Sequence, residues 1–268
     1  KLNDFNFHYD HKGLLMLYKS DNVGEEEWEF GKKGIQQGLQ VENLSANEVE
    51  KLQPNTNLNI KGAVYYHSDA HMTPGVFMKE MISCLDKKGV VFYKNETVKD
   101  LNISRGKITS IITDKREIEV DEVVLAAGSW SPQITKKLGL KIPIQAGKGY
   151  SINVKNDTKI TIPAILCEAK VAITPMQGFT RFAGTMEIAG INHTINAKRV
   201  DAIANAVKNY YENITISSEE KENATCGLRP CSPDGLPYIG KSNKCKNLTI
   251  ATGHAMMGWS LGPATGKL

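Results

Sequence analysis

The chain has 268 residues, enough for one large domain or two modest domains with a hydrophobic core. Hydrophobic residues make up 41% and charged residues 23% of the sequence, as in ordinary globular proteins. The net charge of +4 comes with scattered lysines, which argues against a nucleic-acid-binding protein, and no apolar run approaches the roughly 20 residues that cross a membrane.

The first 67 residues predict short strands and two helices. Loosely alternating apolar residues predict two strands on either side of a turn at Asp10–Gly13. Glu25–Gly38 is predicted to be a helix, and Ser45–Glu48 has the pattern of a capping box that begins a second, short one. Ile60–His67 predicts a further strand. Three apolar residues of the first helical region are expected to face inward: Trp28, Ile35 and Leu39.

Two histidines, His67 and His71, have the spacing of a metal-binding pair on a helix. Thr73-Pro74 follows them, and proline favours the first turn of a helix, so we predict that the helix begins at Pro74, after both histidines. We therefore favour histidines without a metal role. The predicted helix Pro74–Lys88 carries an apolar stripe and stops at Gly89.

The region after this helix is rich in strand patterns. Val90–Tyr93 predicts a strand, and three segments separated by turn residues predict a three-stranded meander: Glu96–Ile103, Lys107–Thr113 and Arg116–Val120. Val123–Ala127 is a continuous apolar run that ends at Gly128. Such a run is typical of a buried parallel strand whose carboxyl end faces a ligand-binding crevice.

Residues 162–211 predict an antiparallel sheet followed by a helix. The strand patterns are Ala164–Glu168, Val171–Thr174 and Phe179–Glu187. Asn196–Tyr211 has apolar residues at helical spacing, and we interpret this stripe as core packing.

The segment Cys226–Leu268 contains the strongest candidate for a functional site. Arg229 precedes Pro230, so its guanidinium leaves a stiff backbone and is suited to binding a carboxylate. A short strand, Leu248–Ala251, leads to Gly253 and then to a helix predicted to begin at about His254. The first amides of a helix lack intrahelical partners and lie at its positive end, so they favour an electron-rich ligand.

The five cysteines are odd in number and form no CxxC pair. This pattern favours free thiols in a reducing compartment over a disulfide framework or a zinc site. We therefore predict no metal site and a cytoplasmic protein, with peripheral attachment to the inner membrane left open.

Two long blocks of sequence resemble the FAD-dependent D-amino-acid oxidase superfamily, and above all its D-amino-acid dehydrogenase branch. One is DEVVLAAGSWSPQITKKLGLKIPIQAGKGYS, Asp121–Ser151; the other is GLRPCSPDGLPYIG followed by ATGHAMMGWSLGPATGKL, within Cys226–Leu268. The resemblance covers nearly the whole chain and is weakest in Lys1–Gly62 and Asp157–Val171.

The resemblance implies a fold of α/β plus α+β type. A partial FAD-binding domain, with a parallel strand, a three-stranded β-meander and helices, would accompany a substrate domain built on an antiparallel sheet. Residues 1–70 and 143–225 would form the substrate domain, and residues 71–142 and 226–268 the FAD-binding domain.

The resemblance also implies a reaction and its residues. A hydride would pass from Cα of a D-amino acid to the flavin, and the imino acid would hydrolyse to a 2-oxo acid and ammonia. Arg229 would hold the substrate carboxylate, with Tyr150, Lys148 and Met256 as further candidates for the substrate pocket. His254 is a candidate catalytic residue, although hydride transfer from a neutral amine needs no protein base. The residues implied in FAD binding are Val98, Ala127, Gly128, Trp130, Gly253, His254 and Gly258.

Several alternatives stay open. Met256 stands where the glycine-oxidase branch carries a second arginine, which favours the dehydrogenase branch. Glycine, sarcosine, proline, hydroxyproline or glycerol 3-phosphate as substrate remain alternatives, as does a non-catalytic domain that keeps the fold. For Trp130, plain core packing is an equal alternative to cofactor binding. The partners expected are an amino-acid substrate and an electron acceptor, either oxygen or a quinone-linked acceptor; nucleic acid and a membrane span are not expected.

The sequence has no GxGxxG motif, which begins the dinucleotide-binding domain of families that bind FAD in this way. We therefore expect a fragment that lacks this segment and part of its last helix. Such a fragment should be without tightly bound FAD and inactive by itself.

Overall fold

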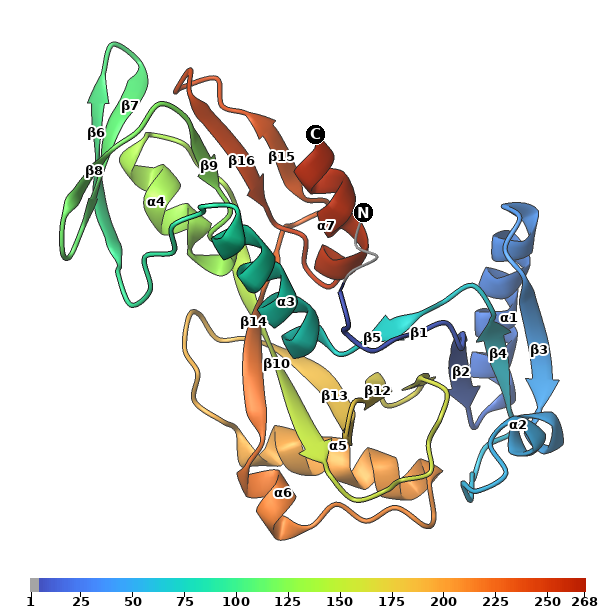
Figure 1. Ribbon diagram of the computed structural model, residues 1–268. Coiled ribbons are helices and arrows are strands. Elements are labelled where there is room, and N and C mark those ends of the chain that lie inside the picture. The colour runs from blue at the N-terminus through green and yellow to red at the C-terminus, as the bar shows by residue number, and fades with distance from the viewer. Residues whose placement is uncertain (1–4) are drawn as a thin grey trace. The chain divides into compact units, whose positions relative to one another are not determined.

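The computed structural model describes residues 5–268 and shows a mixed α/β fold, as predicted (Figure 1). The chain divides into two compact units. Unit 1 comprises Lys1–Val90, Tyr150–Thr185 and Thr194–Cys226, and unit 2 comprises Val91–Gly149, Met186–His193 and Gly227–Leu268. Neither unit is one continuous segment of the chain. Three of the boundaries fall inside strands: Gln145–Val154, Phe179–Ile188 and Thr225–Cys231.

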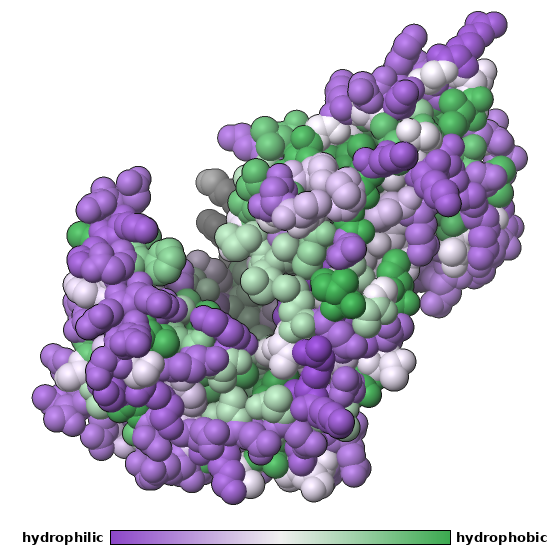
Figure 2. All heavy atoms as spheres, turned by 180° about the vertical axis from the view of Figure 1, so that it is seen from behind, coloured by the Kyte–Doolittle hydropathy of each residue, from purple (hydrophilic) through white to green (hydrophobic). Residues whose placement is uncertain are grey.

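The surface seen in Figure 2 is covered mostly by hydrophilic residues, with apolar residues among them. Among residues 5–268, none of the helices has both the length and the apolar character needed to cross a membrane. No disulfide joins any two cysteines in this described part of the chain.

The unit boundaries differ from those expected from the sequence. The first lies between Val90 and Val91, not after residue 70, because the helix at Pro74–Lys87 packs in unit 1. Its Phe77 ring contacts Phe5 and Phe7, with ring centroids 6.1 and 5.1 Å apart. The short segment 186–193 also belongs to unit 2.

The main sheet has eight strands within the described residues, in the order β14-β10-β13-β12-β11-β2-β4-β3. The pairs β11–β12 and β12–β13 are antiparallel, as predicted, whereas β11 and β2 are parallel. The strands are β2 (Leu14–Tyr18), β3 (Val41–Ser45), β4 (Gly62–Tyr66), β10 (Gln145–Val154), β11 (Ala164–Leu166), β12 (Val171–Met176), β13 (Phe179–Ile188) and β14 (Thr225–Cys231).

Unit 1 also contains a small sheet, β1 (Tyr9–Asp10) paired with β5 (His71–Met72), and several helices. The helices are α1 (Asp21–Gln36), α2 (Ala46–Leu52), α3 (Pro74–Lys87), α5 (Ala197–Tyr210) and α6 (Ser218–Glu222).

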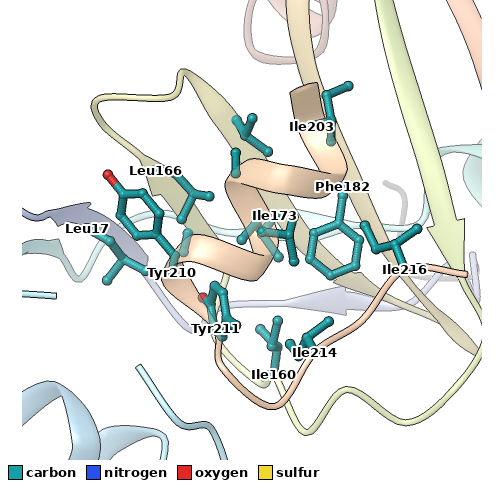
Figure 3. Close-up of a cluster of buried hydrophobic side chains, with 14 of the residues drawn as sticks. Leu17, Ile160, Leu166, Ile173, Phe182, Ile203, Tyr210, Tyr211, Ile214 and Ile216 are labelled. Carbon is teal, nitrogen blue, oxygen red and sulfur yellow. The ribbon is translucent and has the colours of Figure 1, made fainter. Parts of the chain in front are cut away.

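Helix α5 supplies much of the core of unit 1. Its predicted stripe is buried, and Figure 3 shows Ile203 and Tyr210 of the helix in one cluster with Leu166, Ile173 and Phe182 of the sheet. The Asn196 side chain accepts a hydrogen bond from the Lys198 amide and so caps the first turn. The periodicity in the sequence therefore identified both the helix and its buried face.

Helix α1 packs through glycines, and the prediction that Ile35 and Leu39 face inward was wrong. Their exposed fractions are 45% and 43%, whereas Gly24 and Gly31 are buried. A Cβ at Gly31 would lie 3.2 Å from side-chain atoms of the sheet, so the helix backbone approaches the strands closely. The predicted capping box begins α2, where the Ser45 amide donates to Glu48 Oε2 at 2.8 Å.

The two spaced histidines do not share a helix. Helix α3 begins at Pro74, as predicted, so His67 lies in a turn and His71 in β5. His67 Nε2 is 3.2 Å from Glu42 Oε1. His71 is only 8% exposed, neither of its ring nitrogens has a hydrogen-bond partner among residues 5–268, and burial lowers the pKa of its imidazole. No cluster of three metal-binding side chains occurs in the described chain.

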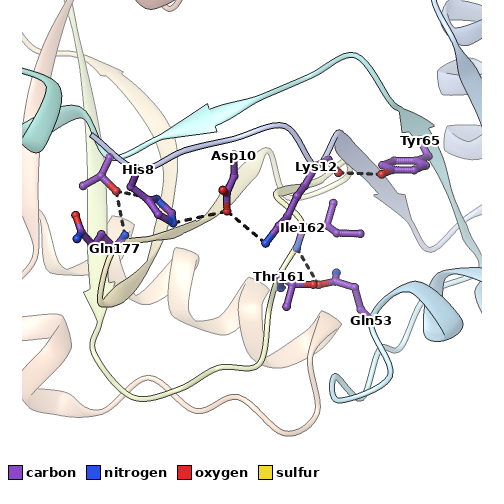
Figure 4. A network of polar contacts seen from close by, with 9 residues as sticks. His8, Asp10, Lys12, Gln53, Tyr65, Thr161, Ile162 and Gln177 are labelled. Atoms are coloured by element: carbon purple, nitrogen blue, oxygen red, sulfur yellow. Dashed lines mark hydrogen bonds and ion pairs between the residues drawn. The ribbon is translucent and has the colours of Figure 1, made fainter. Parts of the chain in front are cut away.

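A polar network anchors the first described residues of unit 1 (Figure 4). Asp10 lies 3.3 Å from Lys12 Nζ and 3.6 Å from His8 Nε2. The Thr73 hydroxyl lies 3.3 Å from His8 Nδ1 and accepts a hydrogen bond from the Gln177 amide at 3.0 Å. These contacts join β1 to the start of α3 and to the turn between β12 and β13.

Unit 2 contains two three-stranded sheets within the described residues. The predicted meander forms one of them, in the order β6-β7-β8, and the other has the order β15-β16-β9, in which β16 and β9 are parallel. The elements are β6 (Val98–Ser104), β7 (Lys107–Thr113), β8 (Glu117–Glu119), β9 (Val123–Leu125), a 3-10 turn (Gly128–Trp130), α4 (Ser131–Lys137), β15 (Tyr238–Lys241), β16 (Leu248–Thr252) and α7 (Gly258–Lys267).

Two further sequence predictions were wrong. Val90–Tyr93 forms no strand, because no described strand pairs with it, and its apolar side chains are exposed. Helix α7 begins at Gly258, not near His254, because Gly253 and Ala255 have φ values of +84° and +46°, which interrupt helical geometry.

Candidate functional site

Two loops meet at the carboxyl ends of β9 and β16. Because these strands are parallel neighbours, the residues that follow them emerge at the same edge of the sheet. The Ser131 hydroxyl donates to Thr252 Oγ1 at 3.0 Å, and the Thr252 hydroxyl donates to the Gly128 carbonyl at 3.2 Å. This chain of hydrogen bonds holds the loop after β9 against the loop after β16.

Each loop contains a glycine in the left-handed region. Gly128 has φ +53° and Gly253 has φ +84°, conformations that residues with a Cβ rarely adopt. Among residues 5–268, no atom lies within 4 Å of the position that a Cβ would take at Gly128, so this backbone leaves room for the close approach of a ligand. Beside it, the half-exposed Trp130 stacks on His193, with ring centroids 6.2 Å apart.

Arg229 lies on β14 directly over Gly149 of the neighbouring strand β10. A Cβ at Gly149 would be 1.8 Å from Arg229 Nη1, so only glycine leaves room for the guanidinium in this position. Nη1 is buried and has no hydrogen-bond partner among residues 5–268. A buried donor without a partner is costly, so an acceptor supplied by a ligand would stabilise this arrangement.

The strand of Arg229 is joined to both glycine-containing loops. The Ala255 amide donates to the Pro230 carbonyl at 3.1 Å, and Cys231 and His254 form an antiparallel bridge. The Ser129 hydroxyl donates to the Leu228 carbonyl at 3.4 Å. Three segments far apart in the sequence therefore lie side by side within unit 2.

His254 is oriented by helix α7. Its Nε2 lies 2.9 Å from Thr265 Oγ1, and the Thr265 hydroxyl donates to the Leu261 carbonyl at 2.9 Å. These contacts fix the orientation of the imidazole ring against the helix. The first residue of α7 is Gly258, and the side chain of the preceding N-cap residue, Met257, makes no capping hydrogen bond.

Of four further candidate residues, Lys148 and Tyr150 flank Gly149 on β10, and Val98 and Met256 lie elsewhere in unit 2. Tyr150 is 1% exposed in the core of unit 1, so core packing accounts for it, and Lys148 is buried with its Nζ 2.7 Å from Asn192 Oδ1. Met256 is 72% exposed in the turn before α7. Val98 lines an apolar cavity of about 340 Å³ in unit 2, together with Leu101, Ile111, Ala127 and Ile134.

Sequence reasoning missed the residues that hold the site together. The hydrogen-bonding roles of Ser131 and Thr252 have no local signature. Gly149 had one, since Gly147 and Gly149 interrupt a strand, and glycine inside a strand often marks a close approach by another group.

A family model described as FAD dependent oxidoreductase (DAO) matches residues 1–268. D-amino acid dehydrogenase from Helicobacter pylori is 33% identical over 265 residues, covering 98% of this chain and 62% of that protein. D-amino acid dehydrogenase from Vibrio vulnificus (strain CMCP6) is 32% identical over 239 residues, covering 87% and 57%. The chain thus spans about three fifths of the length of these curated relatives.

Solved structures share the fold. Glycine oxidase from Bacillus cereus superposes with a TM-score of 0.88 at 24% identity, covering 98% of this chain and 72% of that one. L-proline dehydrogenase from P. horikoshii gives a TM-score of 0.86 at 18% identity, covering 99% and 72%. Because the family model matches along the whole chain, the protein belongs to the DAO family of FAD-dependent oxidoreductases.

Proposed function

We propose that the protein is an FAD-dependent dehydrogenase that oxidises D-amino acids to imino acids, which water then hydrolyses to 2-oxo acids and ammonia. The observation that carries this proposal is the unpartnered Nη1 of Arg229, held over Gly149 on a strand bonded to both glycine-containing loops. The names of the relatives that match most of the chain support the same substrate class.

The residues of unit 2 fit a dinucleotide cofactor. The open backbone at Gly128 and the left-handed Gly253 would allow close approach, and the exposed part of Trp130 offers an aromatic surface. Val98 and Ala127 would contribute apolar contacts from the cavity beside the meander. In this proposal unit 2 holds FAD and unit 1 supplies the substrate domain. Bound FAD would accept the hydride that leaves the substrate Cα.

Arg229 would bind the substrate carboxylate through charge-assisted hydrogen bonds. Its planar fork can make two parallel contacts and thereby fix the orientation of Cα, which lowers the entropic part of the barrier. The backbone amides at the start of α7 would stabilise negative charge, because they lie at the positive end of the helix dipole.

His254 would act through position, not as a base at Nε2. That nitrogen is engaged in the hydrogen bond with Thr265, and the bridge between Cys231 and His254 ties the loop to the strand of Arg229. Oxidation of a neutral amine by hydride transfer requires no protein base, so the proposal assigns no proton transfer to His254.

The test is anaerobic reduction of the full-length protein, loaded with flavin, by single amino acids. D-alanine, D-methionine and D-phenylalanine should bleach the visible flavin absorption, whereas L-alanine should not. Glycine and L-proline belong in the same panel because they are the substrates in the names of the structural neighbours. Bleaching by glycine or L-proline without bleaching by any D-amino acid would refute the proposed substrate class.

A further inference from the structure

We propose that Cys231 and Met186 form the surface that receives the side chain of the substrate and so set its permitted size. This inference rests on the proposed function, because it takes Arg229 as the group that binds the substrate carboxylate.

The two sulfur-containing side chains lie over a glycine in the same way as Arg229 does. A Cβ at Gly147 would be 2.6 Å from Cys231 Sγ and 2.9 Å from Met186 Sδ. Alternate residues of a strand point to the same face, so Gly147 and Gly149 form one track along β10. Side chains from the neighbouring strands β14 and β13 lie across this track.

Cys231 lies within reach of a ligand bound to Arg229. The two residues are two positions apart on β14, so they project from the same face at a spacing of about 7 Å. Cys231 Sγ is 3.9 Å from Met186 Sδ, so the two sulfur atoms form one continuous surface. A substituent on the substrate Cα, one bond from the carboxylate carbon, would extend onto this surface.

The chemistry of this surface favours apolar substituents. Neither a thiol nor a thioether offers a charge or a strong hydrogen bond, so a charged substrate side chain would lose its hydration without compensation. Met186 is half-exposed, and methionine side chains adapt to differently shaped neighbours. Cys231 is half-buried and stiffer, so it would define the limit of the space.

The activity test measures the ratio of kcat/KM for D-phenylalanine to kcat/KM for D-alanine in the flavin-loaded protein. Met186→Ala should raise this ratio about tenfold by opening space, and Cys231→Leu should lower it about tenfold by filling space. Cys84→Ala on α3 is the matched control and should leave the ratio unchanged.

A second test needs no variant and no turnover. Benzoate and acetate both offer a carboxylate to Arg229, but only benzoate also covers the sulfur surface. Benzoate should slow alkylation of Cys231 by iodoacetamide at least fivefold, acetate should slow it less than twofold, and Cys84 should be protected by neither. Unchanged substrate ratios, or equal protection by benzoate and acetate, would overturn the inference. Arg229→Ala separates failure of this inference from failure of the proposed function. If Arg229→Ala abolishes flavin reduction, the proposed function stands even when the two tests above fail. If the variant reduces flavin normally, the proposed function itself fails.

Discussion

The substitution Gly149→Ala should displace Arg229 without unfolding the protein. A Cβ at this position would lie 1.8 Å from Nη1, whereas non-bonded atoms settle at about 3.5 Å. The guanidinium must therefore move by at least about 1.7 Å. The displaced atoms are the end of a flexible side chain, so the cost in unfolding free energy should stay near the lower limit for overpacking, about 1 kcal/mol.

The effect on catalysis should be far larger than the effect on stability. A misplacement of about 1 Å in a positioning group can lower activity about 100-fold, so we expect kcat/KM to fall by about that factor while flavin content stays at the wild-type level. The assays are steady-state kinetics with D-alanine, urea unfolding, and flavin absorbance per protein.

Gly227→Ala provides the matched control for this experiment. Gly227 lies on the same strand as Arg229, and a Cβ there would meet no atom of the described residues within 4 Å, so kcat/KM should be unchanged. Gly149→Ala should also have little further effect when added to Arg229→Ala, because both changes remove one contact. A Gly149→Ala protein with wild-type kcat/KM would refute the assigned position of Arg229.

Two further predictions concern stability. Asn247→Ala should lower the unfolding free energy by about 3 kcal/mol, because the buried Asn247 side chain accepts a hydrogen bond from the Ile108 amide and donates one to the Ile108 carbonyl. Asn156→Ala, on the surface, is the control and should lower it by less than about 0.5 kcal/mol. Equal midpoints of urea unfolding for the two variants would contradict this prediction. Burial lowers the pKa of His71 below its ordinary value of 6.5, and the opposing effect of Asp10 is smaller. At a pH near 6.5 the unfolded chain therefore binds more protons than the folded one, so stability that is present above pH 6.5 should be lost as the pH falls below it. His71→Gln should flatten this pH dependence of urea unfolding between pH 7.5 and 5.5. An equally steep loss of stability in the variant would exclude His71 as its source.

Regular elements could be predicted where the pattern was local. The meander, α3, α5 and the capping box of α2 follow from periodicity, turn residues and end signals in the sequence. The start of α7 could not be predicted, because neither the positive φ of Ala255 nor its backbone bond to Pro230 has a signature in the local sequence. The face of α1 was misjudged because its contacts pass through Gly24 and Gly31, whereas the large apolar residues that guided the prediction are exposed.

The candidate site was predictable as separate motifs but not as an arrangement. Arg229 and Gly253 could be selected from residue type and spacing. Their adjacency depends on the parallel pairing of β16 with β9 and on the bond between Ala255 and Pro230, which are tertiary features. The demand for glycine at position 149 arises from a side chain on another strand, so it has no explanation within its own segment.

The most direct test of the account is anaerobic stopped-flow reduction of the flavin-loaded Arg229→Ala protein by D-alanine. Loss of a buried charge-assisted contact costs about 2–5 kcal/mol, so the efficiency of flavin reduction should fall by about 30-fold to several thousand-fold, with flavin content unchanged. Arg229→Lys should recover only part of this loss, because an ammonium group cannot reproduce the two-pronged contact. Near-normal bleaching of Arg229→Ala by D-alanine would contradict the assignment of Arg229 to the substrate carboxylate.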